Sequence, residues 1–299
     1  MLLALGCTWG ASFLFIKVLV DEISTIEIVT GRLVFGAVVV LAFVAWRRQP
    51  LGWTPGLIAR LVVVAALANI LPFALIAWAE KHIESGTASV LNSTLPIFTA
   101  VLAAAFLAAE RFTPARLGGL VLGFLGIVVL NGEDAVRVTD SDILGQLAVI
   151  AAAACYGGSS VYTRTLLRQN DPVSLSALQL VLASVLSLPL LLLFEGTPGY
   201  DSMSLEGWLS LLGLGMAGTG VAYIAYVWLI EQTGSVRASL VTYIIPVVAL
   251  FLGWAVLDES IGLNTVAGAA LIIVGVASVM RGQGPGAAAR LEAAPVPAD

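Results

Sequence analysis

Ten long apolar runs follow one another along the chain, and each is bounded by a short polar or turn-forming stretch. A run of about 20 apolar residues is long enough to cross the hydrocarbon core of a bilayer as a helix. The pattern therefore predicts an all-α integral membrane protein with ten transmembrane helices. The approximate ranges are 1–20, 26–46, 57–79, 86–108, 114–131, 143–166, 173–194, 208–230, 236–257 and 263–281.

The composition agrees with a bilayer environment. Hydrophobic residues make up 59% of the chain and charged residues only 11%, with a mean hydropathy of +1.00. Soluble domains carry about 25% charged residues. The net charge of −5 and the lack of a basic face argue against a nucleic-acid partner. Cys7 and Cys155 fall within apolar runs, where packing is a better interpretation than a disulfide or a metal site.

The residues that many enzymes need are scarce. Neither of the two lysines, Lys17 and Lys81, lies in a phosphate-binding loop motif, and His82 is the single histidine. The acids are scattered singly, and none lies in the middle of an apolar run. We therefore expect no catalytic residue, no metal, no cofactor and no enzymatic activity. A neutral or zwitterionic substrate that moves down its gradient, or by exchange, fits this pattern better than a proton relay through the middle of the membrane.

The basic residues fall almost entirely on one side of the predicted membrane. The side shared by the loops after even-numbered runs and by the C-terminus holds Arg47, Arg48, Arg60, Arg111, Arg116, Arg164, Arg168, Arg237, Arg281 and Arg290, whereas the opposite loops are rich in acids. The positive-inside rule then predicts a multi-pass protein of the cytoplasmic membrane with both termini in the cytoplasm. The first run lacks a basic N-terminal region, so we interpret it as a helix of the mature chain.

The two halves of the chain repeat each other. The stretch "TWGASFLFIKVLVDE" (8–22) aligns with "CYGGSSVYTRTLLRQ" (155–169), and "TASVLNSTLPIFTAVLAAAFL" (87–107) aligns with "RASLVTYIIPVVALFLGWAVL" (237–257). We predict a first five-helix repeat at 1–131, a linker at 132–142, a second repeat at 143–281 and a disordered tail at 282–299. Because five is odd, the second repeat would enter the membrane inverted, as in many secondary transporters.

These features resemble the EamA family of the drug/metabolite transporter superfamily. The resemblance rests on Trp9-Gly10-Ala11-Ser12-Phe13 with Lys17, Arg32, Pro96, Glu110-Arg111-Phe112-Thr113, the glycines Gly118, Gly119, Gly123 and Gly126, and in the second half Pro246, Asp258-Glu259, Gly268 and Gly275. Ser260-Ile261-Gly262 matches less well than Arg111-Phe112-Thr113. The resemblance implies ten helices in an inverted repeat and transport of a metabolite, often the export of amino acids or related compounds.

Polar and aromatic residues near the middle of the predicted runs are the candidates for substrate contact. They are Trp9, Asn69, Asn92, Tyr156, Thr219, Tyr223, Thr242 and Tyr243. Proline at this depth frees a carbonyl and kinks a helix, so Pro96 and Pro246 are candidates for kinks or gates. Glu110 and Glu259, each at the end of a fourth helix, are the matching gate candidates.

Several of these residues have a second interpretation. Asn69 and Asn92 could form hydrogen bonds between helices, and the glycines would allow close helix packing. Arg32, equivalent to Gln179 in the second half, could bind substrate, extend to the headgroups or pair with Asp21 or Glu22. Lys17, near the end of the first helix, is better explained as a helix-end anchor than as a substrate ligand.

The sequence therefore favours a secondary transporter for a small metabolite, with an amino acid or related zwitterion as the leading substrate and efflux as the expected direction. Alternating access of the two repeats would move the substrate. A channel, a scaffold without transport, or a transporter of nucleosides, sugar derivatives or drug-like compounds are the alternatives. The expected partners are a small molecule and the lipid bilayer, and the sequence leaves open whether the chain forms a homodimer.

Overall fold

The computed structural model of the chain describes residues 1–106, 114–131, 140–166, 170–196, 198–233, 238 and 240–281. Within these residues every regular element is a helix, as expected for an all-α protein. The elements are α1 (Leu2–Leu19), α2 (Thr25–Arg47), α3 (Pro55–Ala65), η1 (Ala66–Ile70), α4 (Leu71–Ala79), α5 (Ser85–Asn92), α6 (Leu95–Phe106), α7 (Pro114–Asn131), α8 (Asp140–Leu166), α9 (Pro172–Phe194), η3 (Gly199–Ser202), α10 (Leu205–Leu212), η4 (Gly213–Val221), α11 (Ala222–Thr233), α13 (Val241–Leu257) and α14 (Leu263–Arg281).

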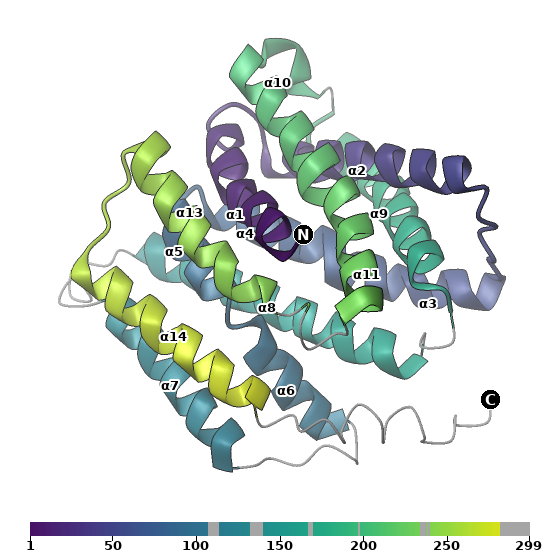
Figure 1. The fold of residues 1–299 in the computed structure, drawn as a ribbon. Helices are drawn as coiled ribbons and strands as arrows, with labels where there is room; N and C mark the ends of the chain where they lie inside the picture. Colours follow the sequence, from purple (N-terminus) through teal and green to yellow (C-terminus); the bar gives the residue numbers. More distant parts are fainter. Residues whose placement is uncertain are drawn as a thin grey trace.

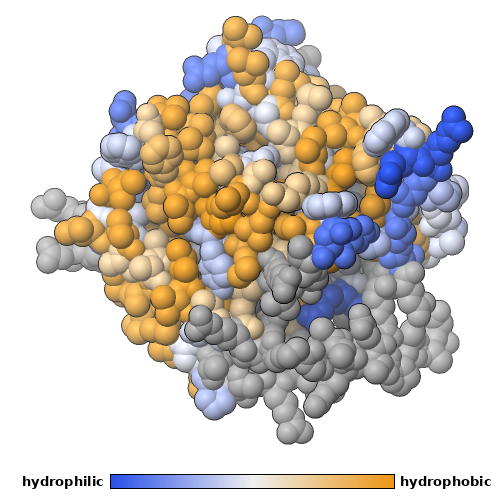
Figure 2. All heavy atoms as spheres, in the orientation of Figure 1, coloured by the Kyte–Doolittle hydropathy of each residue, from blue (hydrophilic) through white to orange (hydrophobic). Residues whose placement is uncertain are grey.

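Eight of the described helical stretches are long and apolar enough to cross a membrane. Two further apolar helices, Leu117–Leu130 and Val241–Leu257, are shorter. Many large apolar side chains are exposed on these helices, including Phe106, Phe124 and Leu193. Figure 2 shows that apolar residues cover most of the visible face, while hydrophilic residues gather at its edges. Such a surface is stable against lipid and unstable against water.

The helices begin at residues with strong start preferences. The hydroxyl of Ser24 accepts a hydrogen bond from the backbone of Glu27, and the Glu27 carboxylate accepts one from the backbone of Ser24, which forms a capping box on α2. The side chains of Thr54 and Asp171 each accept one backbone hydrogen bond and so cap α3 and α9, and each is followed by a proline at the first helical position. These caps satisfy backbone groups that the ends of a helix leave without partners.

A break before a proline and two π-helix segments interrupt three of the long stretches. The fourth apolar run breaks between α5 and α6, just before Pro96, so this proline lies in the first turn of α6. Pro246 lies inside α13, and the helix continues through it. The π segments η1 and η4 interrupt the third and the eighth apolar runs, a feature that hydropathy alone does not reveal.

The helices of the first half pack mainly against helices of the second half. The pairs that contact each other are α7 with α14, α1 with α13, α8 with α6, α2 with α9, α2 with η4, and α3 with α9. The pair α7 and α14 lies side by side at the lower left of Figure 1, and α2 lies beside α9 at the upper right. Residues far apart in the sequence therefore share one interior.

Glycines bring the backbones of α7 and α14 together. A Cβ atom on Gly119 would lie 2.5 Å from the carbonyl oxygen of Gly275, and one on Gly275 would lie 2.6 Å from the carbonyl oxygen of Gly119. A Cβ atom on Gly126 would likewise lie 2.8 Å from the carbonyl oxygen of Gly268, and one on Gly268 would lie 2.8 Å from that of Gly126. These distances are too short for a side chain, so the contact requires glycine at each position. Gly118, which the sequence suggested for the same role, has open space around it.

We expect the substitution Gly275→Ala to destabilise the protein, because the new methyl group would meet the backbone of α7. Overpacking of this kind costs about 1–3 kcal/mol. The measurement is the thermal unfolding midpoint of the purified protein in detergent. Gly118→Ala is the matched control, since it adds the same methyl group to α7 where no atom lies within 4 Å. Equal unfolding midpoints for the two variants would contradict this packing.

Candidate functional site

Arg32 is a cation inside the helix bundle. Its residue is 8% exposed, and its Nε donates a hydrogen bond of 2.8 Å to the hydroxyl of Thr219 on η4. Its guanidinium lies over the ring of Phe73 on α4, 3.7 Å from the ring centroid. A cation at this distance from an aromatic face is stabilised by the ring quadrupole. Arg32 therefore neither extends to the headgroups nor depends on Asp21 or Glu22, the two alternatives that its sequence position left open.

The π segment η4 borders this site, and side chains bind its carbonyl groups. The hydroxyl of Thr219 donates to the carbonyl oxygen of Leu214 at 3.1 Å. The indole Nε1 of Trp9, on α1, donates to the carbonyl oxygen of Gly218 at 3.1 Å. Both side chains therefore add hydrogen bonds to carbonyl groups of the π segment, in an interior where water is scarce. Trp9 thus links α1 to the π segment that borders Arg32.

The second π segment, η1, places another polar group inside the bundle. Asn69 is fully buried, and its Oδ1 accepts a hydrogen bond of 2.9 Å from the hydroxyl of Tyr223 on α11. Its Nδ2 is buried and has no hydrogen-bond partner among the described residues. Tyr156 on α8 packs against two clusters of buried apolar side chains, and one of these clusters contains Phe73 of α4. Tyr156 and Tyr223 both lie within electrostatic range of Arg32.

We use the name Arg32 cluster for Arg32, Asn69, Phe73, Tyr156, Thr219 and Tyr223. Its members come from α2, η1, α4, α8, η4 and α11, so both halves of the chain contribute. Asn69, Tyr156, Thr219 and Tyr223 were expected at a central site, whereas Phe73 was not. The signal for Phe73 was its position: it lies 150 residues before Tyr223, the offset that also separates Pro96 and Pro246 in the aligned repeat stretches.

Other candidates lie elsewhere. The hydroxyl of Tyr243 on α13 donates to the sulfur of Met280 at 3.0 Å, and the ring packs with α14. Asn92 ends α5, and its Oδ1 is buried without a hydrogen-bond partner among the described residues. Thr242 and Gln179 are half-buried on α13 and α9. Depth in the membrane was the basis for choosing these residues, and depth does not determine the side of a helix on which they lie.

Carboxylates join the two halves at one end of the bundle. We call this end, formed by the turns 20–24, 80–84, 198–204 and 258–262, the acidic end. Glu22 accepts hydrogen bonds from the backbone and hydroxyl of Ser204, at 2.8 and 2.6 Å. Glu27 accepts one from the backbone of Gly199. Each of these bonds places a carboxylate of the first half against a turn of the second half.

Tyr200 adds a further bond at the same place. Its hydroxyl donates to the carbonyl oxygen of Glu27 at 2.9 Å. Burial, followed by the neighbouring charge of Glu27, raises the pKa of Tyr200 to about 12. The phenol therefore keeps its proton at every physiological pH and remains a hydrogen-bond donor.

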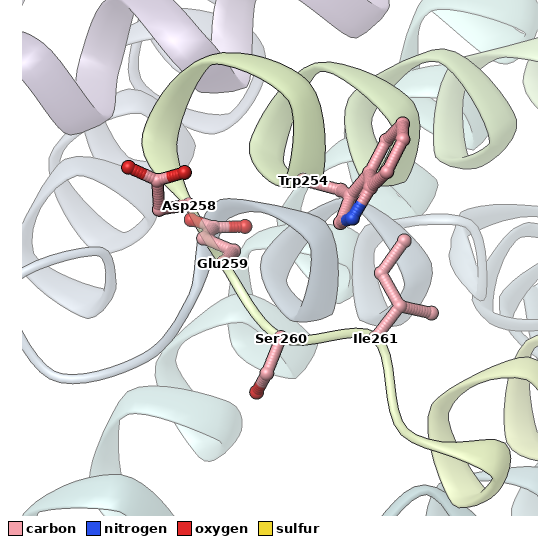
Figure 3. A pocket seen from close by; sticks show the side chains of 5 residues that line it. All are labelled: Trp254, Asp258, Glu259, Ser260 and Ile261. Atoms are coloured by element: carbon pink, nitrogen blue, oxygen red, sulfur yellow. The ribbon is translucent and has the colours of Figure 1, made fainter.

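Glu259 makes the reciprocal connection from the second half. Its carboxylate accepts hydrogen bonds from the backbone of Ser85 at 2.7 Å, the hydroxyl of Ser85 at 3.0 Å and the backbone of Gly86 at 3.1 Å. These donors lie at the start of α5, where a negative charge is stabilised by the helix dipole. Glu259 also lines a surface pocket with Trp254, Asp258, Ser260 and Ile261 (Figure 3). This pocket shares no residue with the Arg32 cluster. Glu110, the other gate candidate, lies outside the described residues.

Lys17 and Glu80 meet beneath the acidic end. The ammonium group of Lys17 donates to the carbonyl oxygens of Glu80 and Ile83, at 2.6 and 3.1 Å. It therefore joins α1 to the turn that follows α4. The Glu80 side chain is fully buried, and neither carboxylate oxygen has a hydrogen-bond partner among the described residues. Glu80 was not a candidate from the sequence, because it stands at the edge of an apolar run.

No described group of three or more His, Cys, Asp or Glu residues could hold a metal ion. What the Arg32 cluster offers instead is a fixed cation, hydroxyl and amide groups, and aromatic faces in an apolar surrounding. Guanidinium groups bind carboxylates through paired hydrogen bonds. This combination suits a small ligand that carries a carboxylate and an apolar or cationic part.

Several known proteins similar to this chain are transporters by name. The chain is 31% identical to an uncharacterized transporter of Archaeoglobus fulgidus over 94% of this chain and 98% of that one. It is 28% identical to the uncharacterized transporter YoaV of Bacillus subtilis, over 90% and 91% of the two chains. A probable terminal-alkyne amino-acid exporter of Streptantibioticus cattleyicolor is 27% identical over 92% and 90%.

A solved crystal structure shares the fold with a TM-score of 0.63 at 20% sequence identity, over 91% of this chain and 95% of the other. The model of the EamA-like transporter family matches residues 1–132 and again residues 143–281. Together these two matches cover most of the chain. The chain therefore belongs to the EamA-like transporter family.

Proposed function

We propose that the chain is a secondary transporter for a small zwitterionic metabolite, with amino acids as the substrate class, and that the substrate carboxylate binds Arg32. The observation that carries this proposal is the buried guanidinium of Arg32. Its hydrogen bond to Thr219 engages Nε. The terminal nitrogens are the groups that form paired hydrogen bonds with a carboxylate. An intramembrane cation is costly unless it serves a ligand or a charge partner.

The aromatic and polar members of the Arg32 cluster fit the rest of such a substrate. The rings of Tyr156 and Tyr223 can accept an ammonium group by cation–π attraction or pack against an apolar side chain. The unpaired Nδ2 of Asn69 is a donor for a second substrate oxygen. The amino-acid exporter among the similar proteins supports this substrate class and the efflux direction.

The helix contacts support an arrangement of ten helices in two inverted repeats. If the halves exchange, α1 corresponds to α8, α2 to α9, α3–α4 to α10–α11, α5–α6 to α13, and α7 to α14. The larger contacts between the halves then map onto one another: α1 with α13 becomes α8 with α6, and α2 with η4 becomes α9 with the third run. The pairs α2 with α9 and α7 with α14 map onto themselves.

The two π segments fit the same exchange. Asn69 in η1 and Thr219 in η4 are separated by 150 residues, as are Phe73 and Tyr223. The repeat therefore accounts for a site in which each half supplies one polar residue from a π segment and one aromatic residue four positions later. A substrate at this interface would be released to either side when the halves rock against each other.

The charge distribution supports an orientation with both termini in the cytoplasm, so that the acidic end faces outward. In this orientation the hydrogen bonds of Glu22, Glu27 and Glu259 form the outer gate of an alternating-access cycle. The gate joins the halves through charge-assisted bonds to backbone groups, which can be replaced by water when the end opens.

Counterflow in proteoliposomes tests the proposal. Vesicles that contain purified protein are loaded with one unlabelled compound and exposed to a trace of the same compound in radiolabelled form. The panel contains amino acids, nucleosides and sugars. We expect counterflow with one or more amino acids and none in protein-free vesicles. Counterflow only with nucleosides or sugars would overturn the substrate class, and none with any compound would overturn transport.

We expect Arg32→Gln to lower the counterflow rate at subsaturating substrate at least about tenfold, which corresponds to about 1.4 kcal/mol. Arg32→Lys should also be impaired, because an ammonium group cannot form the paired bonds of a guanidinium. Arg48→Gln is the control, since Arg48 is exposed at the end of α2. Thermal unfolding of each variant separates lost binding from lost folding. Unimpaired counterflow in folded Arg32→Gln protein would contradict the assignment.

Lys17 should contribute to stability rather than to substrate affinity. In Lys17→Met the carbonyl groups of Glu80 and Ile83 lose their donor, which costs about 1–3 kcal/mol for buried groups. We expect a lower unfolding midpoint and an unchanged substrate KM in the protein that remains folded. Lys81→Met is the control, because Lys81 is exposed one residue after Glu80. A normal unfolding midpoint together with a strongly raised KM would place Lys17 in the substrate site instead.

A further inference from the structure

Glu80 is the one fully buried carboxyl group that neither the packing nor the Arg32 cluster explains among the described residues. It follows directly after the membrane-spanning stretch Pro55–Ala79. The residue is 0% exposed, and both carboxylate oxygens lack a hydrogen-bond partner there. An ionised carboxylate without partners in an apolar interior costs several kcal/mol, whereas the neutral acid costs much less. This geometry favours the protonated form.

The charges around Glu80 do not neutralise it. Lys17 on α1 is the cation that most favours ionisation of Glu80. Its ammonium group, however, donates to backbone carbonyls and not to the Glu80 carboxylate. Glu259, which follows α13, opposes ionisation, and Arg32 on α2 favours it weakly. Burial raises the pKa of Glu80 well above its ordinary value, and this effect exceeds the opposing effect of the Lys17 charge.

The remaining neighbours add little charge. The α8 surface that packs with this region includes Gly145, Ala148 and Val149, and Asp142 at the start of α8 is engaged in an interaction of its own. On its own turn, Glu84 is half-buried and accepts a hydrogen bond from Ser260 at 3.3 Å, and the ring of His82 packs on Trp78. The interior at Glu80 is therefore closed by apolar side chains and by the hydrogen bonds of the acidic end.

We propose that Glu80 is a proton-binding site whose occupancy is linked to closure of the acidic end. In the closed form described here Glu80 holds a proton as a neutral acid. Opening of the acidic end would bring water to the carboxyl group, return its pKa toward the ordinary range for glutamate and release the proton. Acid conditions therefore favour the closed form, and alkaline conditions favour the open form.

This inference rests on the proposed function for its place in a transport cycle: each closure of the outer gate would take up one proton, and each opening would release one. The proton comes from water at the acidic end and returns to it, so the step balances without another reactant. The structural linkage itself can be measured without any substrate. Failure of transport and failure of the proton site are therefore distinguishable.

The first measurement detects the proton. Infrared spectra of the purified protein in lipid at neutral pH should contain the carbonyl band of a protonated carboxylic acid. We expect Glu80→Gln to abolish this band, because glutamine has the shape of the neutral acid but no ionisable group. Glu206→Gln, which changes an exposed carboxyl group at the same end, is the control and should leave the band unchanged. A band that persists in Glu80→Gln would overturn the proposal.

The second measurement follows the gate. Nitroxide labels on Asp21→Cys and Asp201→Cys, two exposed positions in different halves, report the separation of the acidic end by electron paramagnetic resonance. The background carries Cys7→Ser and Cys155→Ser. We expect the open population to grow from mildly acidic to mildly alkaline pH in the parent protein and in Glu206→Gln. Glu80→Gln should remain closed throughout. An unaltered pH dependence in Glu80→Gln would overturn the linkage, even if the variant folds and transports normally.

Discussion

The requirement that every backbone group in an apolar environment have a partner shapes this structure more than any other interaction. Regular helices meet it within each segment, which is why the described regular elements are all helical. The requirement becomes demanding where the helix widens into a π segment. In η4 the carbonyl groups of Leu214 and Gly218 are bound by the side chains of Thr219 and Trp9. The same π segment places Thr219 beside Arg32, whose Nε donates a hydrogen bond to the Thr219 hydroxyl.

The same requirement explains the acidic end. The first turn of a helix leaves backbone N–H groups without partners, and a carboxylate is the strongest acceptor for them. Glu259 binds those of α5, and Glu22 binds the backbone and hydroxyl of Ser204, which caps α10. In both cases the carboxylate and the helix come from different halves. The bonds that complete the ends of the helices are therefore also the bonds that close this end of the bundle.

Hydropathy predicted an all-helical chain with several membrane-spanning helices, because burial in lipid imposes length and apolarity on such helices. It could not predict on which side of a helix a residue lies: Tyr243 has a suitable depth and points to Met280 on α14. The partner of Arg32 and the isolation of Glu80 depend on contacts between segments that are distant in sequence. Pattern within a single run contains no information about such contacts.

Arg32 and Glu80 show how a mostly apolar bundle can hold a basic and an acidic side chain without an ion pair between them. Arg32 keeps its charge because an aromatic ring and a hydroxyl compensate part of the lost hydration. Glu80 has no such compensation and is stable as the neutral acid. A direct pair would neutralise both groups and leave nothing for a ligand or a proton to change. Their separation leaves the cation available to an anionic group and the carboxyl group available to water whenever the acidic end opens.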